Sequence, residues 1–170
     1  LIHRGRTGKG QLVDISLYDA SLAMNEVSVA MYSGQKTKSA PGLHPVTAPF
    51  GSYETQDGFI VIAVLGEHIW KRLCDAIQMP ELLQDPRFKD GLTRNRNNSA
   101  LTECLSPWLL ARTRSQALEV LLAAGIPCSA VNDVEDLFTC PHVEAREMLL
   151  TLEDPAWGKL QVVGNPIKMS

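Results

Sequence analysis

A ten-residue run in the last third of the chain, residues 123–132, limits the possible fold more than any other segment. Its Gly125 favours the left-handed backbone conformation that ends a helix, and Pro127 prevents the helix from resuming. The next four residues, 128–131, are small or apolar, as in a short buried strand, and Asn132 can cap a following helix. A helix, a strand and a second helix joined this closely are typical of an α/β protein.

Bulk composition excludes several classes of partner. The chain has 170 residues, of which 45% are hydrophobic, so it can bury one substantial core. Its net charge of −3 argues against a general nucleic-acid binder, which is normally basic. The sequence contains no apolar run as long as a membrane span. We therefore expect neither a nucleic acid nor a membrane as a partner.

The cysteines indicate a reducing environment. None of the four forms a Cys-x-x-Cys pair, and three lie among apolar residues; they are Cys74, Cys104, Cys128 and Cys140. Isolated cysteines of this kind are typical of reduced core residues. We therefore expect a cytoplasmic protein whose cysteines form no disulfide.

The two ends of the sequence indicate a longer parent polypeptide. The chain begins with Leu1 rather than an initiator methionine, and it ends at Ser170 directly after a strand-like run. We expect it to be a fragment of a larger protein.

The N-terminal third is expected to hold one long helix and one long loop. Residues 4–11 are basic and rich in glycine, which is typical of an exposed turn, and residues 12–15 alternate like a short strand. Ser16 can then cap an amphipathic helix that ends near Gly34. Residues 35–49 lack periodicity, and a loop of this length is typical of a functional segment.

A β-hairpin is the most distinct local pattern in the middle of the chain. Residues 50–55 and 59–64 have the composition of strands, and Asp57-Gly58 between them favours a tight turn. Thr113 and Gln116 have the spacing of a capping box that begins a helix. The other expected elements are helices over residues 67–77, 92–111 with a kink or break at Pro107, and 143–148, a helix capped by Asn132 and Glu135, and a second hairpin over residues 149–152 and 159–163.

Several patterns resemble binding sites but have simpler explanations. Residues 5–10 do not match a phosphate-binding loop, because glycine rather than Ser or Thr follows Lys9. Cys140 and His142 have no second pair of metal ligands at a suitable spacing. The charged candidates are interpreted as a helix start (Asp133, Glu135 and Asp136) and a solvated helix face (Arg94 and Arg96). From the residues alone we expect no metal and identify no catalytic group.

Three stretches are more informative together than apart. They are Thr7-Gly8-Lys9-Gly10-Gln11-Leu12-Val13-Asp14-Ile15-Ser16-Leu17, then Gly42-Leu43-His44-Pro45 with Ala48-Pro49-Phe50-Gly51, and finally Ala124-Gly125-Ile126-Pro127-Cys128 with Val163-Gly164-Asn165-Pro166-Ile167-Lys168. Their order and separation resemble the class III CoA-transferase family (CaiB/BaiF type). This family includes formyl-CoA transferases, carnitine CoA-transferases and, more distantly, α-methylacyl-CoA racemases.

The resemblance implies a fold and a division of the chain. In the family a small domain is inserted into a Rossmann-like α/β large domain, and two subunits form an interlocked homodimer. Residues 1–34 would end a large-domain segment with a crossing helix, residues 35–130 would form the small domain, and residues 131–170 would return to the large domain. Within this chain alone we expect an α+β mixture.

The resemblance also implies acyl transfer through an aspartate. In the family a carboxylate attacks an acyl-CoA thioester, which forms an enzyme-bound mixed anhydride and releases CoA thiolate. A coenzyme A thioester is then a substrate rather than a permanently bound cofactor, and a small carboxylic acid is the second substrate. The family's nucleophilic aspartate would precede Leu1, and neither Asp14 nor Asp19 matches it. We therefore assign no catalytic residue to this chain.

A substrate loop is the one candidate site that the resemblance implies within the chain. Formyl-CoA transferases have several successive glycines in this loop, whereas the matching residues 39–45 contain only Gly42, which is followed by Leu43 and His44. We expect Gly42, Leu43 and His44 to form an acyl-pocket loop. A second interpretation of His44 stays open, namely a side chain that only bonds the loop backbone.

Three interpretations of function remain. The first is a part of an acyl-CoA:carboxylate CoA-transferase that is inactive alone. The second is an acyl-CoA racemase of the same fold, which moves a proton α to the thioester. The third is a truncated remnant without catalysis that binds or oligomerises. The Gly-Leu-His-Pro and Gly-Ile-Pro-Cys phrases favour the transferase.

Overall fold

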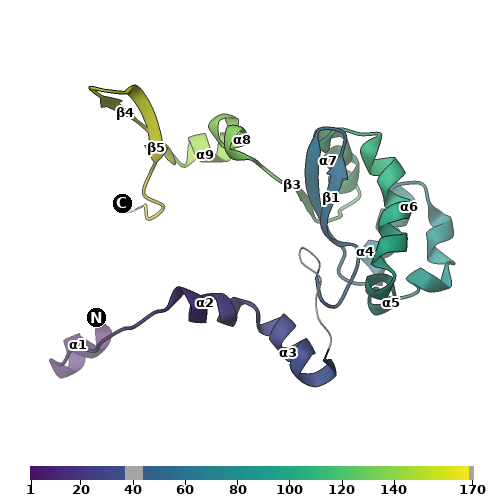
Figure 1. The fold of residues 1–170 in the computed structure, drawn as a ribbon, viewed down its shortest axis with the longest axis horizontal. Helices are drawn as coiled ribbons and strands as arrows, with labels where there is room; N and C mark the ends of the chain where they lie inside the picture. Colours follow the sequence, from purple (N-terminus) through teal and green to yellow (C-terminus); the bar gives the residue numbers. More distant parts are fainter. Residues whose placement is uncertain (37–43, 169–170) are drawn as a thin grey trace.

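The computed structural model describes residues 1–36 and 44–168 (Figure 1). In chain order they form α1 (Ile2–Thr7), α2 (Leu17–Met24), α3 (Glu26–Gln35), β1 (Phe50–Thr55), β2 (Gly58–Ala63), α4 (Glu67–Ala76), the 3-10 helices η1 (Pro80–Leu83) and η2 (Pro86–Phe88), α5 (Gly91–Arg96), α6 (Asn98–Leu110), α7 (Arg114–Ala123), β3 (Cys128–Ala130), α8 (Val134–Thr139), α9 (Pro141–Ala145), β4 (Leu149–Asp154) and β5 (Gly158–Val163). Helices occur together with small antiparallel sheets, which confirms the expected α+β mixture.

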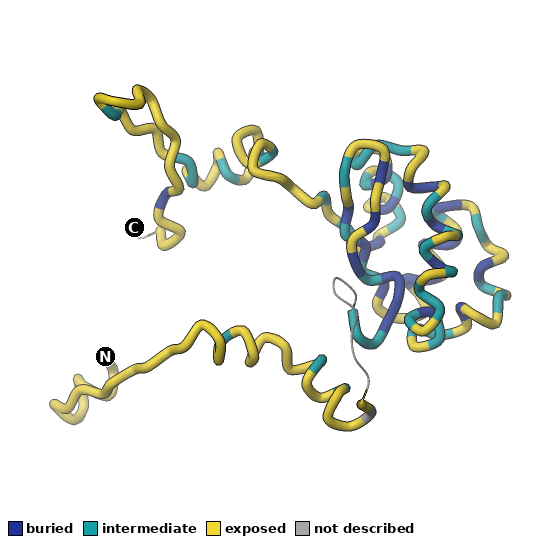
Figure 2. The backbone as a smooth tube through the Cα atoms, viewed as in Figure 1, coloured by how far each residue is buried: buried dark blue, intermediate teal, exposed yellow. Residues whose placement is uncertain are grey.

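The hydrophobic core lies in residues 44–130, which we call the globular unit. Apart from Gly164, every buried residue that the structure describes lies between Thr47 and Ile126 (Figure 2). Helices α6 and α7 pack against a three-stranded sheet in the order β1-β2-β3, and α4 packs against α7. This helical layer covers one face of the sheet and leaves alternate residues on the strands exposed.

The predicted hairpin is confirmed, and a third strand extends it. β1 and β2 pair antiparallel from Phe50 opposite Ala63 to Thr55 opposite Gly58. β3 pairs antiparallel with the other edge of β2. The expectation that residues 128–131 form a buried strand is wrong, because β3 is an edge strand whose residues are half-buried or exposed.

Capping boxes begin two of the helices. The one predicted for α7 is confirmed: Gln116 donates its N–H to Thr113 Oγ1 at 3.3 Å, and Thr113 donates its N–H to Gln116 Oε1 at 3.0 Å. α8 is capped one residue later than predicted, by Asp133 with Asp136 in place of Asn132 with Glu135. The acidic cluster therefore lies at a helix start, as expected.

The N-terminal expectations are corrected in three places. Residues 2–7 form helix α1 rather than a turn, and residues 12–15 form no strand, because no second strand pairs with them. Ser16 does cap a helix, but this helix breaks at Asn25 into α2 and α3. The end of α3 is Lys36, at a φ of 55°, rather than Gly34.

Two further helix boundaries also differ. The helix is not interrupted at Pro107, because α5 and α6 separate at Asn97 and Pro107 lies inside α6. Asn97 ends α5 by donating Nδ2–H to the Thr93 carbonyl at 2.9 Å. Packing of Leu105 and Trp108 on either side of Pro107 into the core offsets the lost backbone hydrogen bond. The helix expected over residues 143–148 is α9, which spans Pro141–Ala145.

Arg94 overturns the interpretation of residues 94 and 96 as a solvated face. Its side chain is 0% exposed, whereas Arg96 is exposed. The guanidinium forms a bidentate ion pair with Glu67 at 2.8 and 3.0 Å and lies over the ring of Trp70 at 4.7 Å. Arg94 is therefore a core residue of the globular unit.

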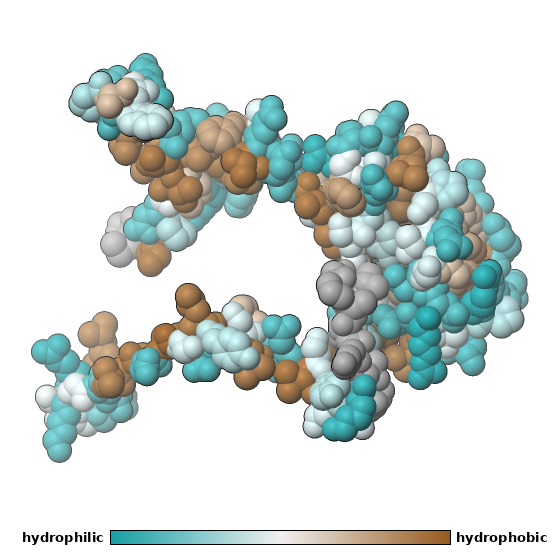
Figure 3. All heavy atoms as spheres, viewed as in Figure 1, coloured by the Kyte–Doolittle hydropathy of each residue, from teal (hydrophilic) through white to brown (hydrophobic). Residues whose placement is uncertain are grey.

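The two flanking segments carry apolar side chains on their surface. Residues 131–168 are called the return segment below. Both this segment and residues 1–36 extend away from the globular unit (Figure 1). Figure 3 shows brown, hydrophobic surface on both segments. Several large apolar side chains on them are exposed, including Leu12, Leu17, Met24, Leu137, Phe138, Leu152 and Trp157. None of the helices described is long and apolar enough to cross a membrane.

Leu121 and Leu122 are neighbours on α7 that test the placement of the core. Leu121 is 0% exposed and Leu122 is 56% exposed. We expect L121A to lower the free energy of unfolding by about 2–5 kcal/mol, because it leaves a cavity. L122A should lower it by less than about 0.5 kcal/mol. Urea denaturation followed by circular dichroism measures both, and equal losses would contradict this core.

Arg94 and Arg96 provide a second matched pair. We expect R94M to lower the free energy of unfolding by about 2–5 kcal/mol, because the buried carbonyl groups of Ala48 and Phe88 lose their donor. R96M should change it by less than about 0.5 kcal/mol, since Arg96 is exposed. Urea titrations of the two variants decide the matter; a stable R94M would show that the guanidinium is dispensable.

Candidate functional site

The candidate site is the end of the loop that enters β1. Of the three residues expected there, Gly42 and Leu43 lie outside the described residues. His44 is described and is half-buried at the entrance to the globular unit. The geometry of the site is therefore the geometry of His44 and of the segment that holds it, residues 44–50.

The ring of His44 is held on both its face and its edge. It stacks on Phe50 with ring centroids 4.5 Å apart and an interplanar angle of 9°. Val46 donates its N–H to His44 Nδ1 at 3.3 Å. Because Nδ1 accepts a hydrogen bond, the ring proton is assigned to Nε2 in the neutral tautomer. His44 thus offers a fixed N–H donor, the type of group that recognises an anionic oxygen.

The backbone of residues 44–50 is held from two sides. Asn95 on α5 donates Nδ2–H to the His44 carbonyl at 2.8 Å and contacts the Thr47 carbonyl at 3.4 Å. On the sheet side, Thr47 donates its hydroxyl to the Val64 carbonyl at 3.2 Å, and Val64 donates its N–H to the Pro49 carbonyl at 2.9 Å. The peptide bond between Ala48 and Pro49 is cis.

Arg94 connects this segment to the core. Its Nε–H donates to the Ala48 carbonyl at 2.7 Å, and an Nη1–H donates to the Phe88 carbonyl at 3.1 Å. Gly91 allows the start of α5 to lie close to Thr47, because a Cβ at position 91 would lie 2.8 Å from Thr47 Oγ1. The segment that carries His44 is therefore fixed to the globular unit by hydrogen bonds and is not a free loop.

Among the described residues, no group has the environment of a catalytic nucleophile. Asp14 and Asp19 are not buried, and Asp19 lies in the first turn of α2. Burial raises the pKa of the Cys74 thiol to about 12, so this cysteine is protonated at neutral pH. All four cysteines are free in the structure; Cys74 is buried, and the other three are half-buried. Cys140 and His142 belong to no cluster of three or more metal-ligating side chains in the described part of the chain.

A hollow lies elsewhere, on the return segment. Its volume is about 670 Å³, and α8, α9, β4 and β5 line it with apolar side chains such as Phe138, Val143 and Leu149. His44 is not among its lining residues. Polar side chains, among them Glu144, line it as well, so its surface is mixed rather than apolar.

Two residues that fix the backbone of residues 44–50, Arg94 and Asn95, were not predicted from the sequence. Arg94 and Asn95 were interpreted as surface residues or left unassigned, although they bond to three carbonyls of residues 44–48. Their partners lie 46 to 51 residues away in the chain, so no local pattern reveals them. The adjacent Ala48-Pro49-Phe50-Gly51 phrase was a partial signal, since it includes Ala48, one of the three residues that these side chains bond.

Comparison with known proteins places this arrangement in a family. The family model described as CoA-transferase family III matches residues 1–170. The chain is 35% identical over 171 residues to the succinyl-CoA:mesaconate CoA-transferase of Haloarcula hispanica. It is 36% identical over 172 residues to the acetyl-CoA:oxalate CoA-transferase of Acetobacter aceti. These matches cover 99% and 100% of this chain but only 42% and 43% of the relatives.

A solved structure shares the fold. The crystal structure of a CaiB/BaiF family protein from Brucella suis matches with a TM-score of 0.73 and 30% sequence identity, over 99% of this chain and 44% of that chain. The chain thus spans about two fifths of the length of the proteins that it resembles. Because the family match extends from the first residue to the last, the chain belongs to CoA-transferase family III.

Proposed function

We propose that this chain is part of an acyl-CoA:carboxylate CoA-transferase that works through an aspartyl anhydride and an aspartyl thioester. The observation that carries this proposal is the family match over all 170 residues, together with relatives named as CoA-transferases at 35% and 36% identity. The substrates are a coenzyme A thioester and a small carboxylic acid, and no permanently bound cofactor takes part.

The chemistry consists of four substitutions at carbonyl carbon. An aspartate attacks the acyl-CoA thioester, the carbon–sulfur bond breaks, and a mixed anhydride and CoA thiolate form. The thiolate attacks the aspartyl carbonyl, which releases the first carboxylate and leaves an aspartyl thioester. The second carboxylate displaces the thiolate to form a new anhydride. The thiolate then attacks the new acyl group, which regenerates the aspartate. The nucleophile belongs to polypeptide outside these 170 residues.

The role of this chain is to shape the acyl pocket. An anhydride hydrolyses unless water is kept away from it, so the pocket needs a cover with a firm attachment. Residues 44–50 have such an attachment through Asn95, Arg94 and the end of β2. We place Gly42, Leu43 and His44 in this cover. The Nε2–H of His44 donates a hydrogen bond to a carboxylate oxygen of the substrate.

The division of the chain and the assembly of the complete protein belong to the same proposal. We assign residues 1–34 and 131–170 to a large domain and residues 35–130 to a small domain, which agrees with the concentration of buried residues between Thr47 and Ile126. Exposed apolar side chains on both flanking segments favour burial against further polypeptide, as in an interlocked homodimer. The free cysteines are consistent with a cytoplasmic protein.

Turnover assays test the transferase directly. The parent polypeptide that contains this chain is incubated with succinyl-CoA or acetyl-CoA and a dicarboxylic acid acceptor, and new acyl-CoA is detected by chromatography. We expect turnover by the parent and none by the 170-residue chain alone. Exchange of the α-proton without movement of the acyl group would establish a racemase, and no reaction by the parent would favour a remnant without catalysis.

His44 is tested in the parent polypeptide with the acceptor acid varied. We expect H44A to raise the KM for the carboxylate by about tenfold, because one hydrogen bond to a charged group is lost. H44Q keeps an N–H donor near the position of Nε2, so it should recover part of this loss. H68A serves as the matched control, since His68 is exposed on α4. Unchanged kinetics of H44A would favour the second interpretation, in which His44 only bonds the loop backbone.

A further inference from the structure

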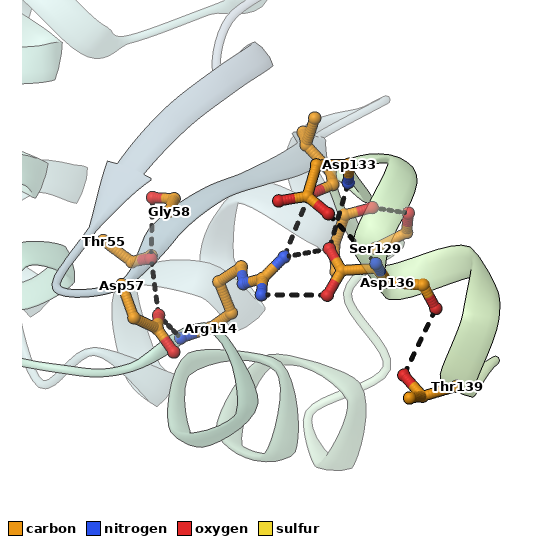
Figure 4. Close-up of polar contacts among 10 residues, drawn as sticks. Thr55, Asp57, Gly58, Arg114, Ser129, Asp133, Asp136 and Thr139 are labelled. Atoms are coloured by element: carbon orange, nitrogen blue, oxygen red, sulfur yellow. Dashed lines mark hydrogen bonds and ion pairs between the residues drawn. The ribbon is translucent and has the colours of Figure 1, made fainter.

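In the described part of the chain, one arginine makes most of the hydrogen bonds that join the return segment to the globular unit. Arg114 is the first residue of α7, and Figure 4 shows its side chain pointing toward the start of α8. Its guanidinium donates to both carboxylate oxygens of Asp136, at 2.8 and 3.3 Å, and to the Val131 carbonyl at 3.1 Å. In the described part of the chain, every hydrogen bond from the globular unit to a residue beyond Val131 comes from this guanidinium.

The carboxylate that Arg114 binds also holds the start of α8. Asp133 donates its N–H to Asp136 Oδ2 at 3.0 Å, and Asp136 donates its N–H to Asp133 Oδ1 at 3.0 Å. Arg114 therefore bonds to the capping box itself and not to a mobile side chain on the helix surface. Orientation of the guanidinium is transmitted directly to the backbone of α8.

The other end of Arg114 is fixed by the turn between β1 and β2. Its backbone N–H donates to Asp57 Oδ1 at 2.6 Å, and the Thr55 hydroxyl donates to the Gly58 carbonyl at 2.9 Å (Figure 4). Gly58 leaves room for the side chain, because a Cβ there would lie 3.2 Å from Arg114 Cδ. Arg114 is thus fixed in the globular unit by its backbone N–H and the aliphatic part of its side chain, while its guanidinium binds the return segment.

We propose that Arg114 is a latch that sets the direction in which the return segment leaves the globular unit, and that breaking it releases residues 132–139 without loosening the sheet. The latch is independent of the acyl-transfer proposal, since it concerns a junction away from His44. Once it opens, the hydrogen bond from Val131 N–H to the Phe59 carbonyl at 2.9 Å is the one hydrogen bond among the described residues that still joins the two parts beside the covalent chain.

The latch should respond to acid. The side-chain hydrogen bond from Arg114, followed by the backbone hydrogen bond from Asp133, holds the pKa of Asp136 below its ordinary value of 3.8. The charged groups that face Arg114 are Asp136, Asp57 and Asp133. Because the folded-state pKa of Asp136 is lowered, the latch is fully present above pH 3.8 and is lost as the pH falls through the lower value.

Amide hydrogen exchange of the ¹⁵N-labelled 170-residue chain, followed by NMR, tests the latch. We expect R114Q to speed exchange of the amides of residues 134–139 by about fivefold, as for loss of one partly buried charged contact, while the amides of β2 stay unchanged. D136N removes the charge from the return segment and keeps the start of α8, because the amide oxygen can still accept from Asp133. It should give the same increase.

Arg87 supplies the matched control. It forms an ion pair with Asp85 at 2.7 Å that stays within the globular unit, so R87Q should leave exchange of residues 134–139 unaltered. Lowering the pH of the unmodified chain through the lowered pKa of Asp136, with exchange rates corrected for intrinsic pH dependence, should reproduce the effect of R114Q. Unchanged exchange in both R114Q and D136N overturns the proposal. A rise in β2 that equals the rise in residues 134–139 also overturns it, since Arg114 would then stabilise the whole fold.

Discussion

The globular unit depends on one buried cation. The Arg94 side chain is completely removed from solvent. Burying a guanidinium costs several kcal/mol unless its N–H donors form hydrogen bonds. Its partners come from three separate places: the Ala48 carbonyl before β1, the Phe88 carbonyl in η2 and the Glu67 carboxylate at the start of α4. The ring of Trp70 covers its face. These segments are held in one arrangement because only that arrangement satisfies the guanidinium.

The two partners of the Arg94–Glu67 ion pair differ in solvent exposure, and this lowers the desolvation cost of the pair. The Arg94 side chain is fully buried, whereas the Glu67 side chain is 56% exposed. The carboxylate therefore keeps much of its hydration, and the desolvation cost falls mainly on the guanidinium, which makes four hydrogen bonds. A well-bonded arginine beside the base of a loop holds the backbone of residues 44–50 without occupying the space above it. Under the proposed function, His44 is then available to contact the substrate.

The elements predicted correctly from the sequence are those that turn and capping residues determine locally. The β1–β2 hairpin follows from alternation around Asp57-Gly58, and the start of α7 follows from the spacing of Thr113 and Gln116. The strand expected over residues 12–15 does not exist, because alternation alone cannot supply a pairing partner. Likewise, the helix break lies at Asn97 and not at Pro107, because packing of the surrounding core residues outweighs the cost of proline.

The candidate site could be located from sequence but not built from it. The Gly-Leu-His-Pro phrase identified His44 through its resemblance to a family, and no spacing rule would have singled it out. The supports of His44 come from α5, about fifty residues later in the chain, and a helical position gives no sign of whether it faces water or a carbonyl. Arg94 and Arg96 show this most clearly, since two arginines two residues apart have opposite environments.

Gly58 meets two independent demands at once, and this shapes how the protein can evolve. Its φ of 143° excludes residues with a side chain, and the stem of Arg114 occupies the space that a Cβ would need. A shorter residue at position 114 would remove the second demand but not the first. Lineages that lose the arginine should therefore still retain the glycine, whereas a lineage that lost the glycine would have to rebuild the turn and displace the arginine together.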